Sequence, residues 1–220
     1  SEKMNTLKKW FIFLMASCML GLTASANATE APDALVKRIS KEVMDAAKAN
    51  KEIKKGNQKQ IYTLVETKIF PHVDFQRMTS LAAGRYWRQA TPAQKEQLTK
   101  EFRDLLVYTY SNAVSKVDNQ RLEFKPLRMS PNATDVIVYS RIIQPRGGEP
   151  IELSYRMEKT DNGWKIYDVS VLGAWLVETY KGTFASEISR SGIDGLISVL
   201  AQKNKQLASG KAGSSSNTAK

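Results

Sequence analysis

Apolar residues recur every three or four positions through the first half of the chain, which predicts a run of helices. Leu35, Ile39 and Val43 fall on one face of the first of these segments, as in an amphipathic helix that packs on a core. The segments that share the pattern are 30–50, 60–70 and 72–85. We interpret the basic stretch Lys51–Lys59 between the first two as a solvated connection, with a membrane-touching patch as the alternative.

The sequence Thr91-Pro92-Ala93-Gln94 marks the start of a long helix. Threonine at the N-cap, proline at the first helical position and glutamine three residues after the cap form a capping box. Apolar residues then keep helical spacing to about Val117. We therefore predict one helix over 92–117.

After residue 120 the pattern changes to alternation and to β-branched residues, which predicts strands. Ile151, Leu153, Tyr155 and Met157 alternate with polar residues, as in a half-exposed antiparallel strand. The predicted strands lie within 121–127, 134–144, 151–158 and 164–171, and short turns separate them. Helices before and after a four-stranded antiparallel meander predict a single α+β domain.

The strand Trp164–Val171 has apolar residues on both faces, so we expect it to be covered on both sides. Simple alternation puts Tyr167, Val169 and Val171 on one face, with Trp164 and Ile166 on the other. Gly173 breaks the strand, and helical spacing follows it. Two further helices are expected there, one to about 190 and one after it.

Length, charge and the N-terminus narrow the class of protein. The chain has 220 residues, and 33 Lys and Arg against 22 Asp and Glu leave a net charge of +11, which suggests an anionic partner. Lys8 and Lys9 precede the apolar run Trp10–Leu22, and small-x-small sites follow it, the pattern of a secretory signal peptide. We predict cleavage after Ala28, with Ala26 as the alternative. Export makes nucleic acid a poor candidate partner.

The predicted organisation is a signal peptide over 1–28, one domain over 29–205 and a disordered Gly/Ser/Lys tail over 206–220. The only cysteine, Cys18, lies in the signal peptide, so no thiol remains after cleavage. Attachment of lipid at Cys18 is disfavoured, because only about seven apolar residues precede it.

Candidate catalytic groups are few. His72 is the only histidine, so no Ser-His-Asp or Cys-His set is supported, and no metal-ligand spacing occurs. Asp168 lies in the middle of a strand, where Asp is disfavoured. We favour a structural hydrogen bond for it over a catalytic acid. We expect no catalytic residue, no metal and no enzyme activity.

Two segments, Phe70–Val114 and Trp164–Ile188, carry a resemblance to a known family. The positions concerned are Pro71, Asp74, Gly84, Tyr86-Trp87-Arg88, Ala90-Thr91-Pro92, Gln94, Phe102, Tyr110, Trp164–Val169, Gly173, Tyr180 and Phe184. They resemble the MlaC family, also described as toluene-tolerance auxiliary proteins, which are periplasmic phospholipid carriers of Gram-negative bacteria. Order and spacing match over about Pro32–Lys205. The chain departs from the family at Ala174-Trp175 and Lys181, and Trp175 would narrow or reshape a pocket there.

The resemblance implies a curved sheet packed against a helical layer, similar to nuclear-transport-factor-like cones, around an apolar cavity. It implies a monomeric periplasmic carrier that maintains outer-membrane lipid asymmetry. Its partners would be phospholipid as cargo, an inner-membrane ABC-type lipid transporter complex and an outer-membrane lipoprotein–porin complex, with no cofactor and no nucleic acid. We expect the acyl chains to be covered by Phe102, Leu106, Tyr110, Leu153, Tyr155, Met157, Tyr167, Val169 and Trp175.

Periodicity alone leaves these apolar faces ambiguous, because a pocket wall and a filled core have the same pattern. Two alternatives therefore remain open. One is a periplasmic hydrolase that uses Asp168 and a second carboxylate, and the other is a protein adaptor with a filled core.

Overall fold

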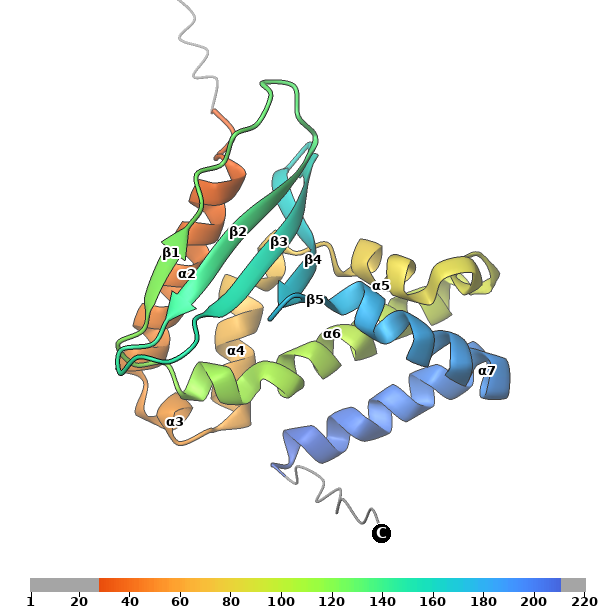
Figure 1. Cartoon of the computed structure of the whole chain (residues 1–220). Helices are drawn as coiled ribbons and strands as arrows, with labels where there is room; N and C mark the ends of the chain where they lie inside the picture. The colour runs from red at the N-terminus through yellow and green to blue at the C-terminus, as the bar shows by residue number, and fades with distance from the viewer. Residues whose placement is uncertain (1–27, 211–220) are drawn as a thin grey trace, which may run out of the picture.

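A computed structural model describes residues 28–210, which run from helices through one sheet and back to helices (Figure 1). The elements are α2 (Pro32–Ala49), α3 (Lys51–Lys54), α4 (Gln58–Lys68), η2 (Phe70–His72), α5 (Phe75–Ala83), η3 (Gly84–Gln89), α6 (Pro92–Ser115), β1 (Arg121–Phe124), β2 (Asp135–Ile143), β3 (Ile151–Thr160), β4 (Gly163–Val171), β5 (Ala174–Trp175) and α7 (Leu176–Ala208). This order confirms the α+β class. The predicted signal peptide lies outside the described residues apart from Ala28, as does the tail from 211 onward.

Side-chain caps define several helix starts. In the predicted capping box, the Gln94 backbone N–H donates to the Thr91 hydroxyl at 3.1 Å, and the Thr91 backbone N–H donates to the Gln94 side-chain oxygen at 2.9 Å. Asp74 accepts from the Arg77 N–H at 2.9 Å and so begins α5. Because these groups satisfy backbone donors that a helix leaves unpaired, they fix where α5 and α6 begin.

The sheet has five strands in the order β1-β2-β3-β4-β5, and every neighbouring pair is antiparallel. The prediction of four strands was wrong, because Ala174–Trp175 turns back and pairs with the end of β4. Leu172 and Gly173 make this tight turn with positive φ angles of 52° and 83°. Gly173 adopts such a backbone readily. The predicted corner is therefore a short hairpin that leads into α7.

The two predicted C-terminal helices form α7, which is broken at Gly192 by a backbone with φ 74° and ψ 178°. The second part folds back beside α6 in Figure 1. The helix ends at Ala208, so it includes residues 206–208 of the predicted tail.

Buried apolar side chains form three clusters instead of one continuous core. The first joins α5, α6 and α7: Met78, Ala82, Ala83, Leu98, Phe102, Leu105, Leu106, Leu176, Phe184, Ile188, Leu196 and Leu200. The second joins α2 to the sheet: Leu35, Val36, Ile39, Val138, Met157, Trp164 and Ile166. The third joins α2, α3, α4 and α6: Ala47, Ile53, Ile61, Val65 and Val107. The sheet therefore packs on α2 through one cluster, while two other clusters hold the helices together.

Candidate functional site

We call the sheet face that α2 covers the inner face. It carries Val138, Tyr155 and Val169, which stand directly opposite one another on β2, β3 and β4. Directly opposed residues in a sheet share a face. The opposite, outer face carries Tyr139, Ser154 and Ser170 by the same register.

The inner face holds apolar side chains that are only half-buried where the first and second clusters meet. Leu153 and Tyr155 on β3, with Val169 and Val171 on β4, all keep accessible surface. Val169 contacts both clusters. Apolar side chains that remain partly accessible on a covered sheet face are the kind that an apolar ligand would cover.

Tyr155 lies in the middle of the inner face, directly opposite Val138 on β2 and Val169 on β4. Burial raises the pKa of its hydroxyl. Its side chain is half-buried and keeps accessible surface. Tyr155 therefore belongs to the partly accessible apolar surface of the inner face.

The three predicted residues of α6 divide between core and surface. Phe102 is 1% exposed and makes edge-to-face contacts with Tyr180 and Phe184, with ring centroids 5.2 and 4.9 Å apart. Leu106 is buried in the same cluster. Tyr110 is 36% exposed, and partial burial raises its pKa. Phe102 and Leu106 therefore belong to the packed helical core, and Tyr110 extends beyond it.

A β-bulge changes the expected faces of β4. Met157 pairs with Ile166 and Arg156 pairs with Asp168, so Tyr167 is the extra residue on β4. Trp164, Ile166, Val169 and Val171 consequently share the inner face, and the predicted alternation was wrong. An inserted residue shifts the side-chain alternation of a strand by one, and sequence alternation cannot reveal it.

Tyr167 is held by polar partners instead of the inner apolar layer. Its hydroxyl donates to both carboxylate oxygens of Asp135, at 2.9 and 2.8 Å. The Arg77 guanidinium from α5 lies 3.7 Å from the centre of its ring and pairs with Glu158. These contacts fasten α5 to the sheet. Met157, in contrast, is completely buried among the residues that join α2 to the sheet.

Trp175 lies on the outer side of the sheet, where the Arg156 guanidinium stacks 4.2 Å from its ring centre. Both residues line a concavity of about 680 Å³ over the sheet. Its other lining residues are mostly polar: Glu123, Phe124, Lys125, Pro126, Ile137, Tyr139, Ser140, Arg141, Glu152, Ser154, Ser170 and Gly173. A hollow with this lining differs from the apolar surface that an acyl chain requires.

Asp168 has the structural role that its position suggested. Its carboxylate accepts hydrogen bonds from the Val169 N–H at 2.9 Å and the Val177 N–H at 3.2 Å. The second N–H belongs to the first turn of α7, so a β4 side chain caps this helix. Burial raises the pKa of Asp168, and the nearby Arg156, at 3.7 Å, lowers it. Both hydrogen bonds go to Oδ1 and give Asp168 its structural role, while Oδ2 is buried without a hydrogen-bond partner among the described residues.

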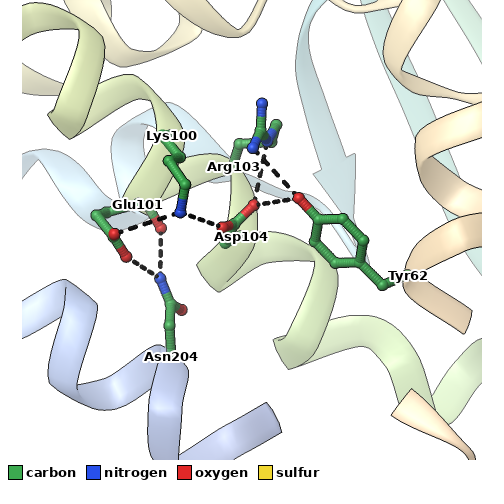
Figure 2. Close-up of polar contacts among 6 residues, drawn as sticks. All are labelled: Tyr62, Lys100, Glu101, Arg103, Asp104 and Asn204. Carbon is green, nitrogen blue, oxygen red and sulfur yellow. Dashed lines mark hydrogen bonds and ion pairs between the residues drawn. The ribbon is translucent and has the colours of Figure 1, made fainter. Parts of the chain in front are cut away.

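A polar cluster that the sequence did not indicate holds α6 between α4 and α7 (Figure 2). The Tyr62 hydroxyl donates to Asp104 at 2.8 Å, and Lys100 and Arg103 each donate to the same carboxylate at 3.1 Å. Asn204 of α7 donates to the Glu101 carbonyl at 2.9 Å and to its carboxylate at 2.8 Å. Tyr62 and Asp104 are 42 positions apart, so no local spacing could have shown the contact.

The remaining candidate chemistry is sparse. Burial and the neighbouring charges of Arg38 and Lys165 lower the pKa of His72, which ends η2. Among residues 28–210, no group of three His, Cys, Asp or Glu side chains is placed to hold a metal ion. No helix in that part of the chain combines the length and apolar character needed to span a membrane.

Comparison with known proteins gives consistent results. The profile of the MlaC protein family matches residues 37–202. The intermembrane phospholipid transport system binding protein MlaC of Haemophilus influenzae is 26% identical over 203 residues, which cover 91% of this chain and 95% of that protein. The toluene tolerance protein ttg2D of Pseudomonas putida is 26% identical over 191 residues, or 86% of each chain.

A solved structure resembles the fold directly. The phospholipid-binding protein from Ralstonia solanacearum, determined in complex with a phospholipid, superposes with a TM-score of 0.76. It is 44% identical in sequence, and the match covers 80% of this chain and 98% of that one.

Proposed function

The chain belongs to the MlaC protein family, and from this we propose that it binds phospholipid as part of an intermembrane phospholipid transport system. The observation that carries the proposal is the Ralstonia protein with its bound phospholipid, because that relative shares the fold over nearly its whole length. The named relatives are binding and transport proteins, so the proposed role is carriage of lipid and not its chemical conversion.

The proposed lipid-binding site lies between the inner face of the sheet and α6. A two-tailed phospholipid has about 30 methylene groups, and each costs roughly 0.8 kcal/mol to expose to water. Leu153, Tyr155 and Val169 offer half-buried apolar surface on the sheet side, and α6 offers the exposed ring of Tyr110. We take these four residues as the wall that contacts acyl chains.

The other predicted residues have different positions in the proposal. Phe102, Leu106 and Met157 are buried in the core clusters and support the wall from behind. Tyr167 and Trp175 make their aromatic contacts with arginines, away from the inner apolar layer. They position α5 and the β4–β5 turn, and we assign them no acyl contact.

In the cell, the protein would act as a periplasmic monomer after removal of its signal peptide. It would carry phospholipid between an inner-membrane ABC-type transporter complex and an outer-membrane lipoprotein–porin complex, and thereby maintain lipid asymmetry. The open sheet and the helices around it would form the cone-like container of nuclear-transport-factor-like folds.

Solvent extraction of the purified protein tests the proposal. We expect close to one phospholipid per protein by phosphate assay and mass spectrometry. L153E should lower this ratio strongly, because it buries a charge against acyl chains. Y139E is the matched control: Tyr139 is 44% exposed and lies on the outer face of the neighbouring strand.

The outcome is informative only if both variants fold, which circular dichroism and thermal unfolding would establish. Absence of phospholipid from the wild-type protein would contradict the proposed function. An equal fall in bound phospholipid in L153E and Y139E would contradict the proposed wall but not the proposed function.

A further inference from the structure

Five lysines lie at the corner where α2, α3 and α4 meet, at the lower left of Figure 1. One is in the last turn of α2, three are in or directly after α3, and one is in the first turn of α4. All five are exposed. We call this set the lysine corner: Lys48, Lys51, Lys54, Lys55 and Lys59.

The lysine corner carries a concentrated positive charge. Residues 48–59 contain five lysines and one acidic residue, Glu52, which leaves +4. Glu52 pairs with Lys55 at 3.3 Å. Over residues 28–210, the other four ammonium groups have no carboxylate within 4.0 Å. Unneutralised charge of this density attracts a polyanionic surface.

Local structure holds the lysine corner in place. The Asn50 side chain accepts from the backbone N–H groups of Glu52 and Ile53, at 3.0 and 3.2 Å, and so caps α3. Asn57 caps α4 through the Gln60 N–H at 3.1 Å. Ile53 is 2% exposed and anchors α3 in the third apolar cluster. The chain here is a fixed turn, and the predicted simple connection contains a capped helix.

The positive charge of the lysine corner comes from lysine alone, and this favours a lipid surface over a protein as the partner. Residues 48–59 contain no arginine and no aromatic residue, although arginine, tyrosine and tryptophan are enriched at protein interfaces and lysine is depleted there. Lysine is a flexible, strongly hydrated point charge without the fixed geometry of a guanidinium. Clusters of four to eight basic residues are typical of sites that attract anionic lipid headgroups.

We propose that the lysine corner docks this protein on the surface of an anionic phospholipid bilayer. The choice of a bilayer over another polyanion rests on the proposed function. The position suits that role, because Ile53 packs with Val107 and Val114 on the C-terminal half of α6. Tyr110 of the proposed wall lies on the same half, so docking brings this end of the lipid site toward the membrane.

Vesicle flotation of the full chain tests the proposal. The wild type should bind vesicles that contain about one-third phosphatidylglycerol and not vesicles of phosphatidylcholine alone, and salt near 0.5 M should abolish binding. K48Q/K51Q/K54Q/K59Q leaves the Lys55–Glu52 pair in place. Its partition coefficient should fall on the order of 600-fold, since each of the four lysines contributes on the order of fivefold at an anionic surface.

The matched control removes the same charge elsewhere. K159Q/K181Q/K203Q/K205Q changes four exposed lysines outside the corner and should bind within about threefold of wild type. Equal loss in both variants would mean that net charge alone acts, which overturns the proposal. Binding to soluble polyglutamate without binding to vesicles would overturn it in favour of an acidic protein partner.

Phospholipid extracted from the same samples separates the two hypotheses. The lysine-corner variant should retain its bound phospholipid at the wild-type ratio, because the four replaced lysines are exposed and none belongs to the proposed wall. If wild type and variant both lack phospholipid, the proposed function fails, whatever the flotation result. If both hold phospholipid and neither floats, only the docking surface fails.

Discussion

Replacement of Asp168 by alanine tests the cap that joins β4 to α7. The substitution removes an acceptor for two backbone N–H groups, those of Val169 and Val177. Hydrogen bonds to a charged group contribute about 1.5–3 kcal/mol each, and loss of a helix cap costs about 0.5–2 kcal/mol. Since Asp168 is 1% exposed, water does not replace the lost acceptor.

We expect D168A to lower the free energy of unfolding by about 2–4 kcal/mol, which corresponds to a fall in Tm of about 5–15 °C for a domain of this size. D168N keeps one acceptor oxygen without a buried charge and should lose less. Thermal unfolding followed by circular dichroism measures both. A D168A protein that unfolds at the wild-type temperature would refute the capping role.

The same pair of variants gives a pH test. Burial raises the native pKa of Asp168 above the ordinary value of 3.8, so the folded state binds the proton more tightly than the unfolded state does. The stability that protonation of Asp168 contributes is fully present below pH 3.8, and it is lost as pH rises through the native pKa. Wild type should therefore gain stability relative to D168N as pH falls through this interval. A constant difference would contradict the assignment.

The remaining predictions concern contacts away from the proposed wall. Y62F should lower the free energy of unfolding by about 1–2 kcal/mol, because buried Asp104 loses one hydrogen-bond donor and keeps two. Urea unfolding would measure this change. Y167F should cost about 0.5–1.5 kcal/mol through its bonds to a half-exposed carboxylate, with extracted phospholipid unchanged. R38Q should lower the free energy of unfolding by less than about 1 kcal/mol. Because Arg38 lowers the pKa of Glu30, this loss of stability is present at neutral pH and disappears as pH falls through the lowered pKa of Glu30.

Much of the fold was predictable because its signals are local. The capping box at Thr91 and Gln94 specifies the start of α6 by itself, and the alternation in β3 identifies a strand with one covered face. The role of Asp168 also followed from a local conflict, since a carboxylate inside a strand requires a polar partner. Such features depend on neighbours in sequence, which the chain displays directly.

The features that were missed depend on contacts between distant segments. The bulge at Tyr167 exists only in the pairing of β4 with β3, so alternation along β4 alone assigned its side chain to the wrong face. Tyr62 meets Asp104 only after α4 has packed on α6. Periodicity likewise could not separate Phe102, a core residue, from Tyr155, which keeps accessible surface on the inner face of the sheet.

The most direct test of the proposed lipid site is photo-crosslinking from defined positions. A benzophenone amino acid would replace Tyr155 on the inner face or, as the matched control, Tyr139 on the outer face of the adjacent strand. After irradiation of protein that retains its natural contents, intact-mass measurement should show one added phospholipid at position 155 and none at position 139. Equal labelling at both positions, or lipid only at 139, would contradict an inner-face site.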